Sequence, residues 1–170
     1  MATMNLRWKP NVTVAAVIER DGLFLLVEEH TAEGLRLNNP AGHLDPGESL
    51  LDGVVRETLE ETTHRFTPTA LLGVYLSRFQ RRGSGDQPDE DVTYLRFAYS
   101  GELGGVVTGR SLDTGIVRTL WMTPEEIRAS VERHRSPLLL RCMEDHLAGQ
   151  RYPLSTVFVD PSVTADSTRR

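Results

Sequence analysis

The chain has 170 residues, 39% of them hydrophobic and 25% charged, and a formal net charge of −5. This composition excludes a disordered or membrane-spanning chain, and the negative charge argues against a nucleic-acid polymer as partner. The lone cysteine, Cys142, excludes an intramolecular disulfide, and residues 1–10 carry no apolar secretory segment. We expect a cytoplasmic monomer or homodimer with one domain over residues 1–154 and a flexible tail over residues 155–170.

The first part of the chain reads as strands. Residues 11–19 and 23–29 are rich in apolar and β-branched side chains, and the intervening Asp21-Gly22 pair favours a hairpin turn. Residues 35–40 read as a short extended segment. Residues 49–62 then form the clearest helix, with Ser49 as its N-cap and apolar positions at helical spacing.

The rest of the chain is predicted to form further strands, followed by two helices. We predict strands over residues 70–81, 91–103 and 116–122, loops over 82–89 and 104–115, and helices over 123–134 and 137–148. The order of strands, helix, strands and helices predicts an α/β (α+β) fold, a mixed β-sheet sandwiched between helices.

Three carboxylates share one face of the first predicted helix. Glu57, Glu60 and Glu61 stand at i, i+3 and i+4 and repel one another unless a cation lies between them. Oxygen-only ligands suit Mg²⁺ or Mn²⁺, and Mg²⁺ takes further ligands from substrate phosphates. The cluster therefore indicates metal-dependent phosphate chemistry, although an acidic face exposed to solvent would show the same triad.

The spacing of the residues before the triad decides between these two interpretations. Gly42 is followed after five residues by Glu48, after seven more by Arg56-Glu57, and after two more by Glu60-Glu61. This pattern resembles the box of the Nudix hydrolase family. The resemblance implies a Nudix fold and a magnesium-dependent enzyme, with Mn²⁺ as a possible substitute, that cuts diphosphate linkages in a small phosphorylated metabolite or nucleotide.

The resemblance also implies roles for the motif residues. Gly42, Glu57, Glu60 and Glu61 correspond to the metal site, and Glu60 or Glu61, or a carboxylate from another loop, activates the attacking water. Arg56 corresponds to the residue that orients the glutamates, and Glu48 to its partner or to a carboxylate behind the metal ligands.

The end of the motif departs from the family pattern. Thr63-His64 stands where the family has glycine and an aliphatic residue. A β-branched residue disfavours the left-handed conformation that such a glycine adopts, by about 1–2 kcal/mol. We therefore expect the helix to end about one residue later.

Further stretches resemble one phosphatase branch of the family. They lie at residues 9–15, 27–29, 39–44, 95–97, 135–138 and 149–154. This branch removes phosphate from nucleoside tri- and diphosphates and from hydroxymethylpyrimidine diphosphate, and the resemblance implies the same substrates here.

Other side chains are candidates for the substrate pocket. Arg96 and His43 are candidates to bind phosphate, against a sheet ion pair and a structural hydrogen bond, respectively. Glu102 is a candidate additional base or metal ligand, against a solvent-exposed glutamate. Glu28 and Glu29 end a strand that faces the segment around Gly42 and are weaker candidates.

Three alternatives remain. Hydrolases of ADP-ribose in this family carry a proline downstream, but residues 75–81 contain none. Hydrolases of dinucleoside polyphosphates carry a tyrosine slightly further on, where this chain has Phe79, Gln80 and Arg81. A non-catalytic nucleotide sensor would have no need of the intact glutamates. An isomerase of prenyl diphosphates needs a cysteine in the pocket, and Cys142 lies in a late predicted helix.

Overall fold

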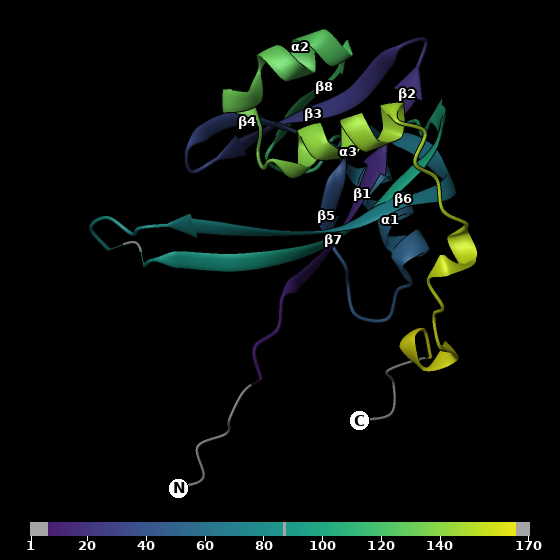
Figure 1. The fold of residues 1–170 in the computed structure, drawn as a ribbon, viewed down its shortest axis with the longest axis horizontal. Coiled ribbons are helices and arrows are strands. Elements are labelled where there is room, and N and C mark those ends of the chain that lie inside the picture. Colours follow the sequence, from purple (N-terminus) through teal and green to yellow (C-terminus); the bar gives the residue numbers. More distant parts are fainter. Residues whose placement is uncertain (1–6, 87, 166–170) are drawn as a thin grey trace, which may run out of the picture.

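The computed structural model describes residues 7–86 and 88–165. Two β-sheets and three α-helices form its body (Figure 1). The first sheet has the order β5-β1-β7-β6. Its strands are β1 (Asn11–Val17), β5 (Ala41–His43), β6 (His64–Arg81) and β7 (Glu90–Val106). Because β1 pairs parallel with β7 and antiparallel with β5, the sheet is mixed, as predicted.

The second sheet is built around β3 (Leu23–Thr31). It pairs with three strands: β2 (Glu19–Arg20), β4 (Gly34–Asn38) and β8 (Ile116–Met122). The central residues of β3 are buried, and they face both core clusters: Phe24 and Leu26 pack in one, and Leu25 packs in the other. A strand buried on both faces explains the nearly continuous apolar run of its sequence.

Helices cover the first sheet on both faces. The helical segments are α1 (Leu50–Thr62), α2 (Pro124–Ala129), α3 (Leu138–Leu147) and the 3₁₀ turns η1 (Val131–Arg133), η2 (Leu154–Thr156) and η3 (Pro161–Val163). Val14 of β1 packs in the cluster that contains α1, whereas its neighbour Ala15 packs in the cluster that contains α3. The predicted sandwich of mixed sheet and helices is therefore confirmed. None of the helices within the described ranges is both long enough and apolar enough to cross a bilayer.

The paired strands β6 and β7 form a long hairpin that extends as an arm away from the body (Figure 1). Both strands are longer than predicted: β6 begins at His64, and β7 continues to Val106. The prediction began the first strand after Pro68. Pro68 is tolerated because β6 is an edge strand and its pairing shifts register between Pro68 and Ala70.

Both ends of α1 have a local cause. Ser49 and Asp52 form a capping box, in which each side chain accepts a hydrogen bond from the other residue's backbone. The predicted later end of this helix is wrong. The helix stops at Thr62, and Thr63 adopts the left-handed conformation, with φ of 60°, while its N–H donates to Leu59 O. Pairing of β6 from His64 onward requires the chain to reverse at this point.

The helices after β8 differ from the prediction in their bounds. α2 ends at Ala129 and is followed by η1, so residues 123–134 are not one continuous helix. Beyond residue 154, where we expect a flexible tail, η2 and η3 form, and Val157 packs against the core cluster that contains α1. The last part of that expected tail, residues 166–170, lies outside the described residues.

Candidate active site

A cavity of about 400 Å³ lies beside the predicted motif. Residues from both sheets, from α1 and from the segment that leads into α3 line it. On the motif side these are Ala41, Gly42, His43, Asp45, Glu57 and Glu61. The segment before α3 is held there because Arg135 N donates to Leu37 O of β4 at 2.8 Å. The cavity therefore depends on elements that are distant in sequence.

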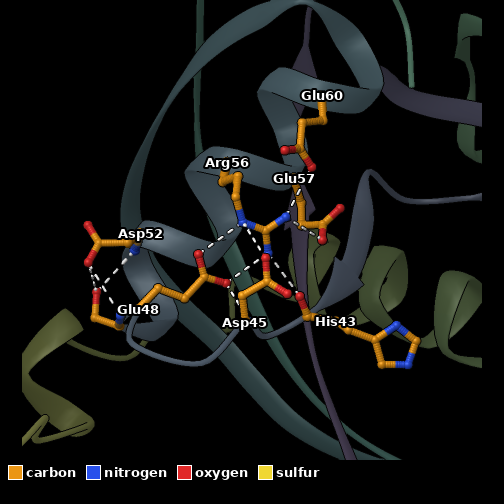
Figure 2. Close-up of polar contacts among 8 residues, drawn as sticks. His43, Asp45, Glu48, Asp52, Arg56, Glu57 and Glu60 are labelled. Carbon is orange, nitrogen blue, oxygen red and sulfur yellow. Dashed lines mark hydrogen bonds and ion pairs between the residues drawn. The ribbon is translucent and has the colours of Figure 1, made fainter. Parts of the chain in front are cut away.

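Arg56 is the centre of a hydrogen-bond network on the motif (Figure 2). Its Nε and Nη2 donate to the two carboxylate oxygens of Glu48 at 2.9 and 2.7 Å. Its Nη1 donates to Glu57 Oε1 at 2.9 Å and to Glu60 Oε2 at 3.0 Å, and Nη2 also donates to His43 O at 2.9 Å. These bonds raise the pKa of Arg56 and lower the pKa of Glu48. The guanidinium thus restrains three glutamates and the backbone of β5 together.

Two of the predicted metal ligands lie at the edge strand β5. The Glu57 carboxylate lies against Gly42, where a β-carbon would overlap it. Glu61 is 7% exposed and accepts a hydrogen bond from Ala41 N at 2.9 Å. Burial raises the pKa of Glu57, and it raises the pKa of Glu61 to about 8. Two poorly solvated carboxylates therefore meet at one end of the cavity.

The third predicted ligand, Glu60, meets Glu57 at Arg56 Nη1 but borders a different space. It does not line the cavity, and its carboxylate is directed to Arg56. It borders a separate hollow with residues 109–114. Asp113 borders both spaces: its N–H donates to Glu60 O at 2.9 Å, and its charge contributes to the raised pKa of Glu61. The sequence marked residues 104–115 only as a loop, so this carboxylate was missed.

The donor set fits a hard divalent cation. Glu57 and Glu61 supply carboxylate oxygens whose negative charge is disfavoured by burial, so a cation beside them would be stabilising. Gly42 has no side chain to cover its backbone from such a cation. Within residues 7–86 and 88–165, no three His, Cys, Asp or Glu side chains converge as a preformed metal site. The two carboxylates at the cavity suit Mg²⁺, which keeps several waters and takes few protein ligands.

The cavity also contains the two predicted substrate-binding residues. The His43 ring lies 6.1 Å from the Tyr94 ring, centroid to centroid. Arg96 is 6% exposed, and its Nη2 donates to Asn38 Oδ1 at 3.3 Å. Phe79 lines the cavity further along the β6–β7 arm, and the Arg135 guanidinium lies 6.0 Å from its ring. Neither Phe79 nor Arg135 was predicted as a site residue, because their place depends on the arm and on the turn before α3.

Other candidates lie outside the cavity. Glu102 is exposed near the far end of β7, paired with Thr67, and does not line it. Glu28 forms ion pairs with Arg118 and Arg133, which tie β3 to β8 and η1. Cys142 belongs to α3 and is buried in the core, where burial raises its thiol pKa to about 11. A thiol so placed does not serve the cysteine chemistry of a prenyl diphosphate isomerase.

Comparisons with known proteins agree with this geometry. The NUDIX domain model matches residues 8–142. Phosphatase NudJ of Escherichia coli O1:K1 / APEC is 36% identical over 151 residues, which cover 88% of this chain and 92% of that protein.

Solved structures show the same relationship. A NUDIX hydrolase from Nitrosomonas europaea is 48% identical, has a TM-score of 0.79, and is matched over 89% of this chain and 98% of its own. A MutT protein from Methanosarcina mazei Go1, at 23% identity and a TM-score of 0.60, covers 86% of this chain and 100% of its own, and it shows the shared fold alone. With the motif on α1 and a matched domain over most of its length, the chain belongs to the Nudix hydrolase family.

Proposed function

We propose that this Nudix hydrolase is a divalent-metal-dependent phosphatase that acts on nucleoside tri- and diphosphates or on hydroxymethylpyrimidine diphosphate. The observation that carries the proposal is the convergence of Glu57 and Glu61 on one end of a cavity whose other walls carry Arg96 and Arg135. The similarity to Phosphatase NudJ supports phosphate release as the reaction.

In this proposal the carboxylates would hold a divalent cation and the attacking water. Glu57 and Glu61, with the Gly42 backbone, would hold Mg²⁺ or Mn²⁺, and the family resemblance adds Glu60 to this set. When bound, the cation neutralises charge on the diphosphate oxygens. Glu61, which lines the cavity, is the first candidate to take the proton of a water that attacks phosphorus. Asp113, which also lines the cavity, is the second candidate for this role.

Arg56 acts as a positioning residue in this proposal. It does not line the cavity, but its Nη1 is shared by Glu57 and Glu60, so their carboxylates are held before substrate arrives. Glu48 in turn holds Arg56 through both of its oxygens. Arg96, Arg135 and His43 line the space that the substrate would occupy, where they favour an anionic, phosphorylated small molecule.

The test is a product assay with a matched pair of variants. Purified protein is incubated with Mg²⁺ and nucleoside di- and triphosphates, hydroxymethylpyrimidine diphosphate, ADP-ribose and diadenosine polyphosphates, and orthophosphate is separated from pyrophosphate. We expect orthophosphate from the first two groups, reduced at least about 10³-fold in Glu61→Gln. Glu125→Gln, an exposed glutamate of α2, is the control and should retain the full rate.

Other outcomes would redirect the assignment. Turnover confined to ADP-ribose or to diadenosine polyphosphates would replace the proposed substrates. Tight binding of a nucleotide without turnover of any substrate would indicate a sensor. An undiminished rate in Glu61→Gln would remove Glu61 from the mechanism.

A further inference from the structure

A second group of polar side chains lines the same cavity. It comprises Thr13 of β1, Glu29 of β3, Asn38 of β4 and Arg96 of β7, and we call it the polar cluster. Thr13 and Arg96 are directly paired residues of the parallel strands β1 and β7, so their side chains project from the same face. Asn38 connects the two sheets by accepting from Arg96 Nη2.

The polar cluster holds buried atoms that make no hydrogen bond within the described part of the chain. These are Thr13 Oγ1, Glu29 Oε1, and Arg96 Nε and Nη1. A buried polar group without a partner destabilises the protein, and more strongly when it is charged. Their place in the cavity indicates that a ligand or ordered water completes them.

Comparison of Glu29 with its neighbour Glu28 shows that the missing hydrogen bonds belong to the cavity and are not common to the carboxylates of β3. Glu28, one residue earlier, is also buried, but Arg118 and Arg133 donate to its two oxygens at 2.8 and 2.7 Å. Around the half-buried Glu29, Arg135 Nε lies 3.5 Å from Oε1, and Asn38 and Arg96 are also close, but Oε1 makes no hydrogen bond. Glu28 is therefore satisfied as a structural ion pair, whereas Glu29 retains an open acceptor inside the cavity.

The chemistry of the open atoms defines their complement. A glutamate carboxylate only accepts hydrogen bonds, and an arginine guanidinium only donates them. The complement is an edge that presents N–H donors beside a carbonyl or ring-nitrogen acceptor, as an amino-bearing heterocycle does. Phe79 and Tyr94 line the same cavity and supply flat apolar surface suited to a planar ring.

We propose that Glu29, with Asn38 and Arg96, forms a recognition subsite for the heterocycle of the substrate and selects rings that carry an exocyclic amino group. This inference rests on the proposed function, because it names the part of the phosphorylated substrate that the cavity reads. Glu29 accepts from the amino group, and Arg96 donates to the adjacent ring nitrogen or carbonyl oxygen.

The test uses ligand pairs that differ at this amino group. Guanosine and inosine 5′-monophosphates, and cytidine and uridine 5′-monophosphates, are titrated calorimetrically into the full chain, which requires no hydrolysis. The amino-bearing member of each pair should bind about tenfold more tightly, as expected for a hydrogen bond to a charged acceptor. Glu29→Gln should reduce this ratio to about twofold or invert the cytidine–uridine preference, because its amide donates as well as accepts.

The control is Glu33→Gln on the same hairpin, where an exposed glutamate pairs with Arg36 outside the cavity. This variant should keep the wild-type ratios. Equal affinities within each pair for the wild-type protein would overturn the proposal, whatever the folding of the variants. Unchanged ratios in folded Glu29→Gln would also overturn it and would assign the open atoms to water. If the affinity ratios hold but neither a nucleotide nor hydroxymethylpyrimidine diphosphate is hydrolysed, the proposed function fails while the subsite stands.

Discussion

The carboxylate of Glu57 occupies the space beside the α-carbon of Gly42 that any other residue would fill with its β-carbon. Residue 42 belongs to the edge strand β5 and residue 57 to α1, so this contact sets how closely the helix approaches the strand. It places the carboxylate at the end of the cavity, and Arg56 holds it there.

Gly42→Ala should therefore lower kcat by at least about 10²-fold, because displacement of a catalytic group by about 1 Å costs that much. Thermal unfolding should show that the variant stays folded. Gly105→Ala is the matched control, since a β-carbon there meets no atom within 4 Å, and it should retain full activity. Equal activity of the two variants would contradict the role of this contact.

Arg56→Lys should lower kcat about 10- to 100-fold with a smaller change in KM. Lysine keeps the charge but cannot donate in a fork to Glu48 while also holding Glu57 and Glu60. The comparison is Arg128→Lys, which breaks a similar two-nitrogen pair with Glu144 on the surface and should leave both constants unchanged. A KM effect alone would mean that Arg56 acts on substrate binding.

Thr63→Gly should stabilise the protein by about 1 kcal/mol, a rise in Tm of roughly 2–4 °C. Thr63 has a φ of 60°, a conformation that glycine adopts without strain. The Thr63 side chain makes no hydrogen bond within the described residues, so its removal should lose few contacts. Thr67→Gly, on the extended strand β6, should lower Tm instead. A lower Tm for Thr63→Gly would show that the threonine side chain contributes packing that outweighs its backbone conformation.

Cys142 should react slowly with a thiol reagent in the native protein at pH 8 and rapidly after denaturation. Burial raises its pKa to about 11, against 9.0 for a free thiol, so little thiolate forms in the folded state. Between these values the unfolded chain has lost a proton that the folded chain keeps. Stability therefore falls as pH rises from about 9 to 11, by up to about 1.4 kcal/mol per pH unit.

Chemical unfolding measured across that range, compared with Cys142→Ala, checks the sign. The alanine variant should lose this part of the pH dependence, while dependence from other groups remains. Rapid native-state labelling at pH 8 would show that Cys142 is accessible.

The sequence by itself determined the features that arise within one helix or one strand. Arg56 and Glu60, four residues apart, form the ion pair that their spacing allows, and Ser49 and Asp52 form the cap that begins α1. The family assignment followed from the same local spacing. The apolar runs of β1 and β3 predicted buried strands, although the sequence did not show that β6 would pair from His64 onward.

Only the tertiary structure decided which of these groups share a cavity. It placed Glu57 and Glu61 at the cavity and Glu60 outside it, although Glu60 still meets Glu57 at Arg56 Nη1. It also brought Asp113 to α1 and Glu29 to the vicinity of Arg96. Such contacts depend on strand register, on the packing of two sheets and on the path of loops. These are set by the free energy of the whole fold, which no local pattern encodes.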